Sequence, residues 1–462
     1  MGGLMNIVRW LNAIMLIALI WPGAGYSAEL RRQPYLLAQH ETGITIRWRT
    51  DGQVRKASQV RIGLSVNRLD NIFPAEATPS PDGDYIDWEA VVTGLKPSSF
   101  YFYGIEADYA LIAGGDHRHF FRTAHPETSG EVLRFWCLGD SGANRPRPEA
   151  DASPFGAGII PHPVIVRNGF RQFNGNKLLD GILLLGDNAY ELGTDREYQS
   201  ALFNTYSDEL TRTPLWPCVG NHDLDTAYEK VFKAKAKAIR DRFSESFPFY
   251  YSFKNGPAHF VVLDPWKSWL ETTSSPDHKP WKKQLTWLKE DLEDNQSYWT
   301  ILITHFPLYC DGNYNSDTDT VLVQLREMLI PVIDEYGVDM VLAGHDHTYQ
   351  RSWLIHNHTG DSKSFDMESH RISSSDGVSE PMVKSTADGK GTVYIVSGNA
   401  GGTRPIGNFK HPAMIPLAPG SPNPNGQAVP GSLALEISKK SIQGFHVDYN
   451  GKVIDRFQLI KK

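Results

Sequence analysis

The sequence of 462 residues predicts an α/β domain preceded by an all-β domain. Residues 31–124 carry short alternating strands separated by Gly, Pro and Asp, a pattern typical of a β-sandwich. Residues 132–462 carry short runs of Val, Ile and Leu among helical stretches such as 320–336, which favours an α/β domain. A polar segment at residues 123–131 separates the two. This division agrees with a length prior of about 150 residues per domain.

The N-terminal unit alternates with period two at residues 44–49, 59–62 and 100–105. The stretch from Val92 to Tyr103 resembles a fibronectin type III segment near its tyrosine corner. No constellation of catalytic residue types occurs in this unit. We therefore expect it to pack beside the second domain, and independent ligand binding is the alternative.

The composition is that of an ordinary soluble globular protein, with 40% hydrophobic and 21% charged residues. The formal net charge of −7 gives no general attraction to nucleic acid, so no nucleic acid is expected as a stable partner. Only three cysteines occur. Cys137 and Cys218 lie in apolar context and are expected to be buried thiols, whereas Cys310 is expected in a loop.

The first residues have the features of an export signal. Arg9 precedes an apolar run over residues 13–21, and small residues follow as far as Ala28. The run is too short to cross a bilayer and predicts a signal peptide over residues 1–28. An uncleaved membrane anchor is the alternative. We expect a secreted or periplasmic protein with no membrane span after cleavage.

The second domain contains five short blocks of Asp, Asn, His and Tyr beside glycine or a small polar residue. In chain order they are Gly139–Gly142, Gly186–Tyr190, Gly220–Asp223, Thr304–His305 and Gly344–His347. Four of them follow apolar runs expected to be central strands, at residues 132–138, 182–185, 301–303 and 340–343. Ligands gather at the carboxyl ends of strands in open α/β sheets. The blocks are therefore expected to converge on one place.

Each block alone also has a purely structural explanation. An Asp after a strand is usually a turn residue or a helix cap. Tyr190 alone would be a packed aromatic side chain, and Asn221 alone a turn residue. These explanations would have to hold five times in the right order. A binding site is therefore the better interpretation of the set.

The residue types suit two hard or borderline cations, for which thiolate is not needed. Two such cations about 3.5–4 Å apart can activate a water and hold both the attacking and the leaving oxygen of a phosphate ester. Over residues 132–350 the blocks resemble those of the calcineurin-like metallophosphoesterase superfamily and, within it, the purple acid phosphatase family. The resemblance implies a four-layered α/β/β/α domain preceded by a fibronectin type III-like sandwich.

One departure from the superfamily pattern supports the narrower resemblance. The usual first block is Asp-x-His, but Gly142 stands at the His position. As in purple acid phosphatases, Tyr190 is expected to replace the lost ligand. A tyrosinate oxygen favours a trivalent ion, so the resemblance implies Fe(III) together with a divalent Zn, Mn or Fe(II).

The resemblance also implies a role for each block residue. Asp140, Tyr190 and His347 would bind the ferric ion. Asn221, His305 and His345 would bind the divalent ion. Asp187 would bridge the two ions. His222 would face the phosphate as the catalytic residue.

The resulting hypothesis is hydrolysis of small phosphate monoesters by a metal-bound hydroxide, without a phosphoenzyme. Ser141 is the only nearby candidate for a covalent nucleophile. A phosphodiesterase or nucleotidase on the same site is the nearest alternative, and a non-catalytic surface binding protein is an alternative of another class. The sequence does not predict the oligomeric state.

The acid that protonates the leaving group is the weakest part of this resemblance. Purple acid phosphatases usually carry a further histidine between the fourth and fifth blocks, but residues 306–344 contain none. Two candidates stay open: His222 could act alone, or Asp311 could substitute if its pKa is raised.

Overall fold

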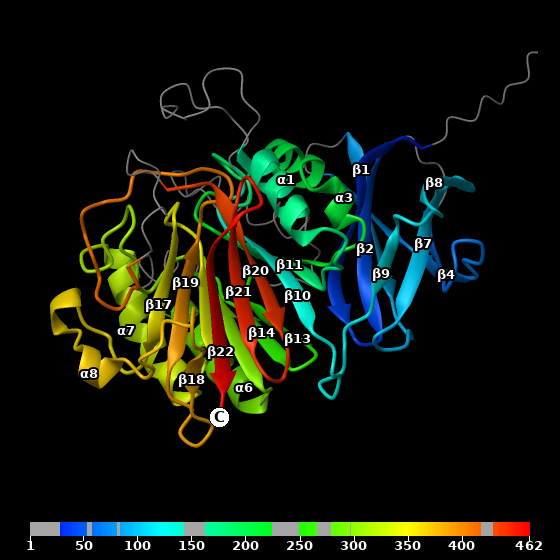
Figure 1. The fold of residues 1–462 in the computed structure, drawn as a ribbon. Helices are drawn as coiled ribbons and strands as arrows, with labels where there is room; N and C mark the ends of the chain where they lie inside the picture. The colour runs from blue at the N-terminus through cyan, green and yellow to red at the C-terminus, as the bar shows by residue number, and fades with distance from the viewer. Residues whose placement is uncertain are drawn as a thin grey trace, which may run out of the picture.

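The computed structural model describes residues 28–52, 58–80, 84–142, 162–223, 249–265, 279–295, 297–416 and 428–462. Within them, two sheets form the N-terminal part of the chain, and two larger sheets with flanking helices follow (Figure 1). The predicted signal peptide at residues 1–28 lies outside the described residues except for Ala28. Among the described residues, no helix has the length and apolar character needed to cross a membrane.

Antiparallel pairing builds the N-terminal part. One sheet has the order β1 (Leu30–His40), β2 (Gly43–Asp51), β6 (Tyr85–Val92) and β5 (Glu76–Pro79). The other has the order β4 (Asn71–Pro74), β3 (Gln59–Gly63), β7 (Phe100–Ala107) and β8 (Ala110–Gly114), with β9 (Phe120–Arg122) paired to β7. Alternate residues of both sheets, among them Trp48 of β2 and Ile62 of β3, share one apolar cluster. The two sheets therefore enclose a common core.

The hydroxyl of Tyr101 accepts a hydrogen bond from the Lys96 backbone N–H at 3.0 Å. A tyrosine that bonds to the backbone a few residues upstream is the contact expected at a tyrosine corner. It closes the turn that leads into β7 within the stretch that resembles a fibronectin type III segment.

Two larger sheets form the second part. The seven-stranded sheet has the order β12 (Leu215–Cys218), β11 (Gly181–Leu185), β10 (Leu133–Leu138), β20 (Gly431–Ile437), β21 (Ile442–Asp448), β22 (Val453–Lys461) and β18 (Met382–Lys384). The six-stranded sheet has the order β13 (Tyr251–Asn255), β14 (Ala258–Val262), β15 (Trp299–Ile303), β16 (Met340–Ala343), β19 (Thr392–Ser397) and β17 (Tyr349–Ile355).

Helices cover the outer faces of these sheets. The longer ones are α1 (His162–Asn174), α6 (Lys279–Asp294) and α7 (Thr320–Glu335). The shorter ones are α2 (Asp195–Tyr198), the π-helix η1 (Gln199–Asn204), α3 (Ser207–Leu210), the 3₁₀ turn η2 (Ser362–Ser364) and α8 (Met367–His370).

Neighbouring residues of one strand show the four layers, because successive side chains of a strand point to opposite faces. In β10, Trp136 stacks on Phe170 of α1 with ring centroids 4.1 Å apart, whereas Phe135 contacts Phe260 of β14 at 4.7 Å. In β15, Leu302 belongs to the cluster that includes α7, whereas Ile301 belongs to the cluster between the sheets. The order α/β/β/α predicted from the resemblance is confirmed.

Buried ion pairs join the N-terminal sheets to the second part. Arg49 of β2 binds Asp87 at 2.7 Å and Asp195 of α2 at 2.6 Å, and Arg32 binds Asp195 at 3.1 Å. The Tyr103 hydroxyl donates to the Thr211 carbonyl at 2.6 Å. The N-terminal part therefore packs directly on the region that carries the second block.

The sequence overstates the irregularity of residues 356–390, whose polar, Ser-rich composition predicts an insertion or mobile loop. The structure places η2, α8 and the sheet strand β18 there. Asp361 and Asp366 accept backbone hydrogen bonds at the starts of η2 and α8, so local capping orders part of this polar segment. All three cysteines are free and buried, Cys310 included.

Candidate metal centre

The five blocks meet where strands of the two sheets end. Asp140 follows β10, Asp187 follows β11, His305 follows β15 and His345 follows β16. Asp140, Asp187 and His345 adopt positive φ angles of 56°, 53° and 66°. This left-handed conformation costs an ordinary residue about 1–2 kcal/mol. Such backbone positions cluster at functional sites.

Three buried groups form the centre of this arrangement. Ligand atoms of Asp140, Asp187 and His305 all lie within 4.8 Å of one another. These residues are at most 1% exposed. Two carboxylates held this close inside a protein repel one another unless positive charge compensates them. Carboxylate oxygens and an imidazole nitrogen are suitable ligands for such a cation.

Tyr190 joins the two carboxylates. Its hydroxyl lies 3.0 Å from Asp140 Oδ1, 3.0 Å from Asp187 Oδ2 and 3.2 Å from His347 Nε2. The Nε2 atom of His347 lies 3.4 Å from Asp140 Oδ1. Asp140, Tyr190 and His347, the predicted ferric ligands, therefore form one contiguous donor group.

A second donor group lies on the other side of Asp187. The Nε2 atom of His305 lies 3.2 Å from Asn221 Oδ1 and 3.5 Å from Asp187 Oδ2. Because the Leu185 carbonyl can only accept, His305 Nδ1 carries the proton of their 2.9 Å hydrogen bond. That bond fixes the ring and leaves Nε2 facing the site.

His345 completes this second group. Its ring centroid lies 5.2 Å from that of His305. Its backbone N–H donates to Asp140 Oδ2 at 2.8 Å, which ties the fifth block to the first. All seven predicted metal ligands thus gather in one cluster, and Asp187 Oδ2 contacts a member of each donor group.

His222 lies at the edge of the cluster. Its backbone N–H donates to Asp187 Oδ1 at 2.8 Å, and its ring centroid lies 4.5 Å from that of Tyr190. Its Nδ1 atom lies 3.0 Å from the Glu191 carbonyl, and 28% of its side chain is exposed. The ring is therefore accessible to a substrate, in contrast to the buried ligands. Ser141 is only 1% exposed, which disfavours it as a nucleophile.

Asp223 holds two of the blocks together, a role that the sequence did not predict. Its carboxylate accepts from the backbone N–H groups of Asn188 at 2.9 Å and Gly220 at 2.8 Å, and from the Tyr198 hydroxyl at 2.7 Å. Burial and the nearby Asp187 raise the pKa of Asp223 to about 6. Its position at the end of the third block was the available signal.

Close approach explains two of the block glycines. A Cβ atom on Gly186 would lie 2.3 Å from His305 Nδ1, and one on Gly220 would lie 2.2 Å from Asp187 Oδ1. Any side chain at either position would displace the groups that the strand ends bring together.

Comparisons with known proteins agree with this geometry. The profile of the calcineurin-like phosphoesterase family matches residues 133–349. The similarity to this family therefore covers the part of the chain that holds all five blocks. It is 27% identical over 296 residues to "Purple acid phosphatase 15" of Arabidopsis thaliana, covering 58% of this chain and 49% of that protein. It is 26% identical to "Acid phosphatase type 7" of Danio rerio, covering 61% and 62%.

Two solved structures share the fold. The purple acid phosphatase PPD1 from yellow lupin seeds matches with a TM-score of 0.65 and 16% identity, covering 93% of this chain and 74% of that one. PhoD matches with a TM-score of 0.57 and 14% identity, covering 89% and 85%. By sequence, the chain spans about half the length of the curated relatives it matches.

The loop between the fourth and fifth blocks brings Tyr314 to the site. Its ring stacks on His345 with centroids 4.3 Å apart. Asp346 accepts backbone hydrogen bonds from Asn313 at 3.0 Å and Tyr314 at 3.3 Å and so holds the loop there. From the sequence, Asp311 was the candidate acid in this loop.

Asp311 points elsewhere. Burial raises the pKa of its carboxyl to about 6, against the opposing effect of Lys410. The pKa of Asp311 is therefore raised, as an acid that protonates the leaving group would require. However, the carboxylate lies 3.8 Å from Lys410 Nζ, and among the described residues no hydrogen bond or ion pair links it to a predicted ligand.

The segment that carries Arg404 lies beside the site. The segment follows β19 and first packs against the first block, where a Cβ atom on Gly401 would lie 2.1 Å from the Asp140 carbonyl oxygen. Further along, the Gly407 N–H donates to the Gly312 carbonyl at 2.6 Å, which joins the segment to the loop of Tyr314. Burial raises the pKa of Tyr314, and the charge of Arg404 opposes that rise. A glycine-rich segment after an apolar strand, as in the five blocks, was the signal that could have found it.

Proposed function

We propose that this protein hydrolyses small phosphate monoesters at a dinuclear metal centre. The observation that carries the proposal is the position of Asp187, whose Oδ2 lies 3.0 Å from the Tyr190 hydroxyl and 3.5 Å from His305 Nε2. One carboxylate between two donor groups suits a pair of cations. The similar proteins from Arabidopsis thaliana and Danio rerio are named as acid phosphatases, which supports the same reaction.

The donor chemistry differs between the two halves of the site. A carboxylate, a phenolate and an imidazole from Asp140, Tyr190 and His347 would hold Fe(III). A carboxamide and two imidazoles from Asn221, His305 and His345 would hold Zn, Mn or Fe(II). When bound, the ions would supply an activated water and positive charge for the phosphoryl oxygens.

Two histidines have further roles, one as an oriented metal ligand and one as a hydrogen-bond donor to the substrate. The Nδ1–H of His305 is tied to the Leu185 carbonyl at 2.9 Å and keeps Nε2 aimed at the centre. His222 has a partly exposed ring and would donate a hydrogen bond to the phosphoryl group. A donor aimed at developing charge is worth about 10²–10³-fold in rate.

We further infer that the protein is exported and that its N-terminal sheets form a fibronectin type III-like domain. The apolar run at residues 13–21 supports export. The Tyr101–Lys96 hydrogen bond at 3.0 Å supports the domain type. N-terminal sequencing of the mature protein tests the first inference, since an uncleaved chain would begin at Met1 or Gly2 and a cleaved one near residue 28.

The deciding experiment combines metal analysis, a visible spectrum and a panel of phosphomonoesters and phosphodiesters. We expect two metals per chain, phenolate-to-iron absorption and preference for monoesters. Tyr190→Phe should remove the absorption, and Tyr309→Phe, which changes a buried tyrosine outside the ligand set, should keep it. Two bound metals with no turnover of any ester would overturn the proposal. Turnover of diesters alone would turn it into the phosphodiesterase alternative.

A further inference from the structure

Among the described residues, the ring of His222 makes one hydrogen bond. Its Nδ1 atom lies 3.0 Å from the Glu191 carbonyl oxygen, and because that oxygen can only accept, Nδ1 carries the proton. The bond leaves Nε2 as the ring nitrogen available to a substrate. The orientation of the ring therefore depends on where the Glu191 carbonyl points.

The peptide group that contains this carbonyl is held from its other side by Glu197 of α2. The Glu191 carbonyl and the Leu192 N–H belong to one planar trans peptide group, so they point in opposite directions. The Leu192 N–H donates to Glu197 Oε2 at 3.2 Å. One peptide group thus joins the Glu197 carboxylate to the His222 ring through two hydrogen bonds, and each bond polarises the other.

Glu197 accepts more hydrogen bonds than its place in the helix requires. In a capping box, the glutamate at the third helical position accepts the backbone N–H of the N-cap residue, which here is Thr194 at 2.8 Å. Glu197 also accepts from the Thr194 hydroxyl at 2.8 Å, and from the backbone N–H groups of Glu191 at 2.7 Å and Leu192 at 3.2 Å. Helix capping does not account for the two backbone bonds from residues 191 and 192. They shape the loop that runs from Tyr190 to α2.

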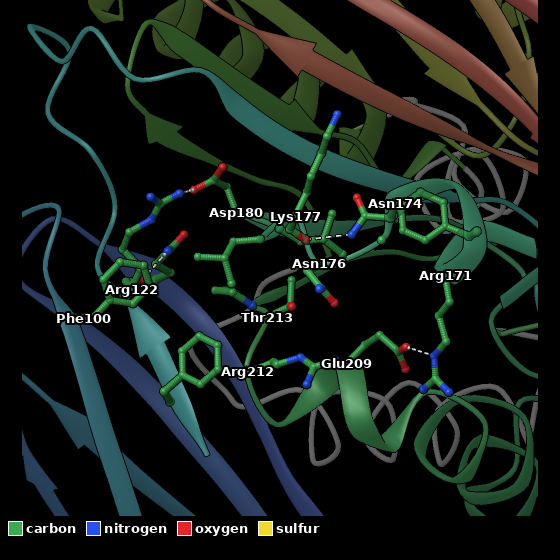
Figure 2. Close-up of a pocket in the computed structure, with 17 residues that line it drawn as sticks. Phe100, Arg122, Arg171, Asn174, Asn176, Lys177, Asp180, Glu209, Arg212 and Thr213 are labelled. Carbon is green, nitrogen blue, oxygen red and sulfur yellow. Dashed lines mark hydrogen bonds and ion pairs between the residues drawn. The ribbon is translucent and has the colours of Figure 1, made fainter. Parts of the chain in front are cut away.

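Helix α2 is a firm base for this loop because the N-terminal sheets bind it directly. Elsewhere the contact between the two parts of the chain is looser, and a cavity of about 210 Å³ lies between them around Phe100 and Leu178 (Figure 2). At α2, by contrast, Arg49 binds Asp195 at 2.6 Å, and Asp195 is the first residue of the helix that carries Glu197. A buried ion pair is costly to break, because its loss leaves an uncompensated charge. The N-terminal sheets therefore fix the helix from which Glu197 reaches the loop.

We propose that Glu197 is a positioning residue for the phosphatase reaction, and that it acts by holding the Glu191 carbonyl in place for the Nδ1–H of His222. This inference rests on the proposed function, in which His222 donates to the phosphoryl group. Among the described residues, none of the hydrogen bonds of the Glu197 carboxylate goes to a predicted metal ligand. Its removal should therefore disturb catalysis by His222 and leave metal binding intact.

A double-mutant cycle with His222 in the full-length protein tests this route. Glu197→Ala should lower kcat at least about tenfold and change KM less than about twofold, with both metals and the phenolate-to-iron absorption retained. In the His222→Ala background the same change should lower kcat less than about twofold, because no ring remains to be positioned. An equal loss in both backgrounds would show that Glu197 acts independently of His222 and would overturn the inference. Loss of either metal from Glu197→Ala would also overturn it.

Asp208→Ala is the matched control for the loss of one negative charge. It removes a carboxylate of α3 that lies 3.0 Å from Arg171 and has a 65% exposed side chain, so kcat should stay within about twofold of the wild type. A loss equal to that of Glu197→Ala would assign the effect to general charge and contradict the inference.

Glu197→Gln, which keeps one acceptor oxygen, takes the place of Glu197→Ala in the cycle if the alanine variant does not fold. Its smaller loss of kcat should likewise disappear in the His222→Ala background, and persistence of the loss there would contradict the inference. A wild type that turns over no phosphate ester would refute the proposed function and with it this inference. An active wild type whose kcat is unchanged by Glu197→Ala would overturn this inference alone.

Discussion

The carboxylate of Asp187 and the imidazole of His305 face one another, with 3.5 Å between Oδ2 and Nε2. Burial by itself would raise the pKa of Asp187 and lower that of His305. The attraction between the two charges outweighs burial, so the pKa of Asp187 falls below its usual range and that of His305 rises to about 9. The metal-free site therefore holds a protonated His305 at neutral pH.

Metal uptake should consequently release this proton, because a ring nitrogen that binds a metal cannot keep its hydrogen. Below the His305 pKa of about 9, affinity for the divalent ion should rise with pH by up to about tenfold per unit. Calorimetry in two buffers of different ionisation enthalpy measures the released protons. An affinity independent of pH between roughly pH 6 and 8 would contradict a protonated His305.

Replacing Asp187 should empty both halves of the centre. Asp187→Asn keeps the volume of a residue that is 1% exposed but removes the charge placed between the two donor groups. We expect loss of both metals and nearly all activity, while circular dichroism still reports a folded protein. Asp208→Asn, which changes a carboxylate with a 65% exposed side chain, is the matched control. Retention of two metals by Asp187→Asn would exclude a bridging role.

His222 should act on the reaction and not on metal retention. Among the described residues its ring is hydrogen-bonded only to the Glu191 carbonyl at 3.0 Å, and 28% of the side chain is exposed. His222→Ala should keep both metals and reduce kcat by a factor of about 10²–10³, corresponding to the loss of about 2.7–4 kcal/mol of transition-state stabilisation. Loss of the divalent ion in this variant would make His222 a metal-supporting residue instead.

Arg404 should strengthen binding of the phosphate dianion. Arg404→Ala is expected to raise KM and to weaken competitive inhibition by inorganic phosphate about tenfold, with both metals retained. Lys410→Ala is the control on the same segment, since Lys410 already lies 3.8 Å from Asp311 Oδ2. If both variants weaken phosphate inhibition equally, the effect comes from general charge and not from a contact made by Arg404.

The sequence predicted the site residues at the ends of the strands but not those on the loops beside the site. Asp140 and Asp187 each follow an apolar strand, so local pattern was enough to bring them together. Tyr314 and the segment of Arg404 lie beside the site because Asp346 anchors one loop and the Gly407–Gly312 hydrogen bond joins it to another. Those contacts link residues roughly 30–95 positions apart in the sequence and leave no local signature.

The same reasoning explains the misplaced Asp311. Its position in the loop was predicted, but its direction depends on Lys410, which lies 99 positions further along the chain and binds the Asp311 carbonyl at 3.3 Å. Charge pairing with Lys410 turns the carboxylate away from the cluster. A sequence pattern specifies the spacing of such a residue and not its partner.

The last prediction concerns protonation of the leaving group, which an acid of matched pKa accelerates by about 10²–10⁴-fold. Tyr314 stacks on His345, and its hydroxyl has no hydrogen-bond partner among the described residues. Burial raises its pKa, so the hydroxyl stays protonated at working pH but gives up its proton reluctantly. We therefore expect good turnover of aryl phosphates and a steep fall for alkyl phosphates in a plot of log kcat/KM against leaving-group pKa.

Tyr314→Phe should steepen that plot, whereas Asp311→Asn should leave its slope unchanged because the carboxylate faces Lys410. A flat plot for the wild type, with chemistry rate-limiting, would require an efficient acid other than Tyr314. A slope that changes only in Asp311→Asn would identify Asp311 as that acid.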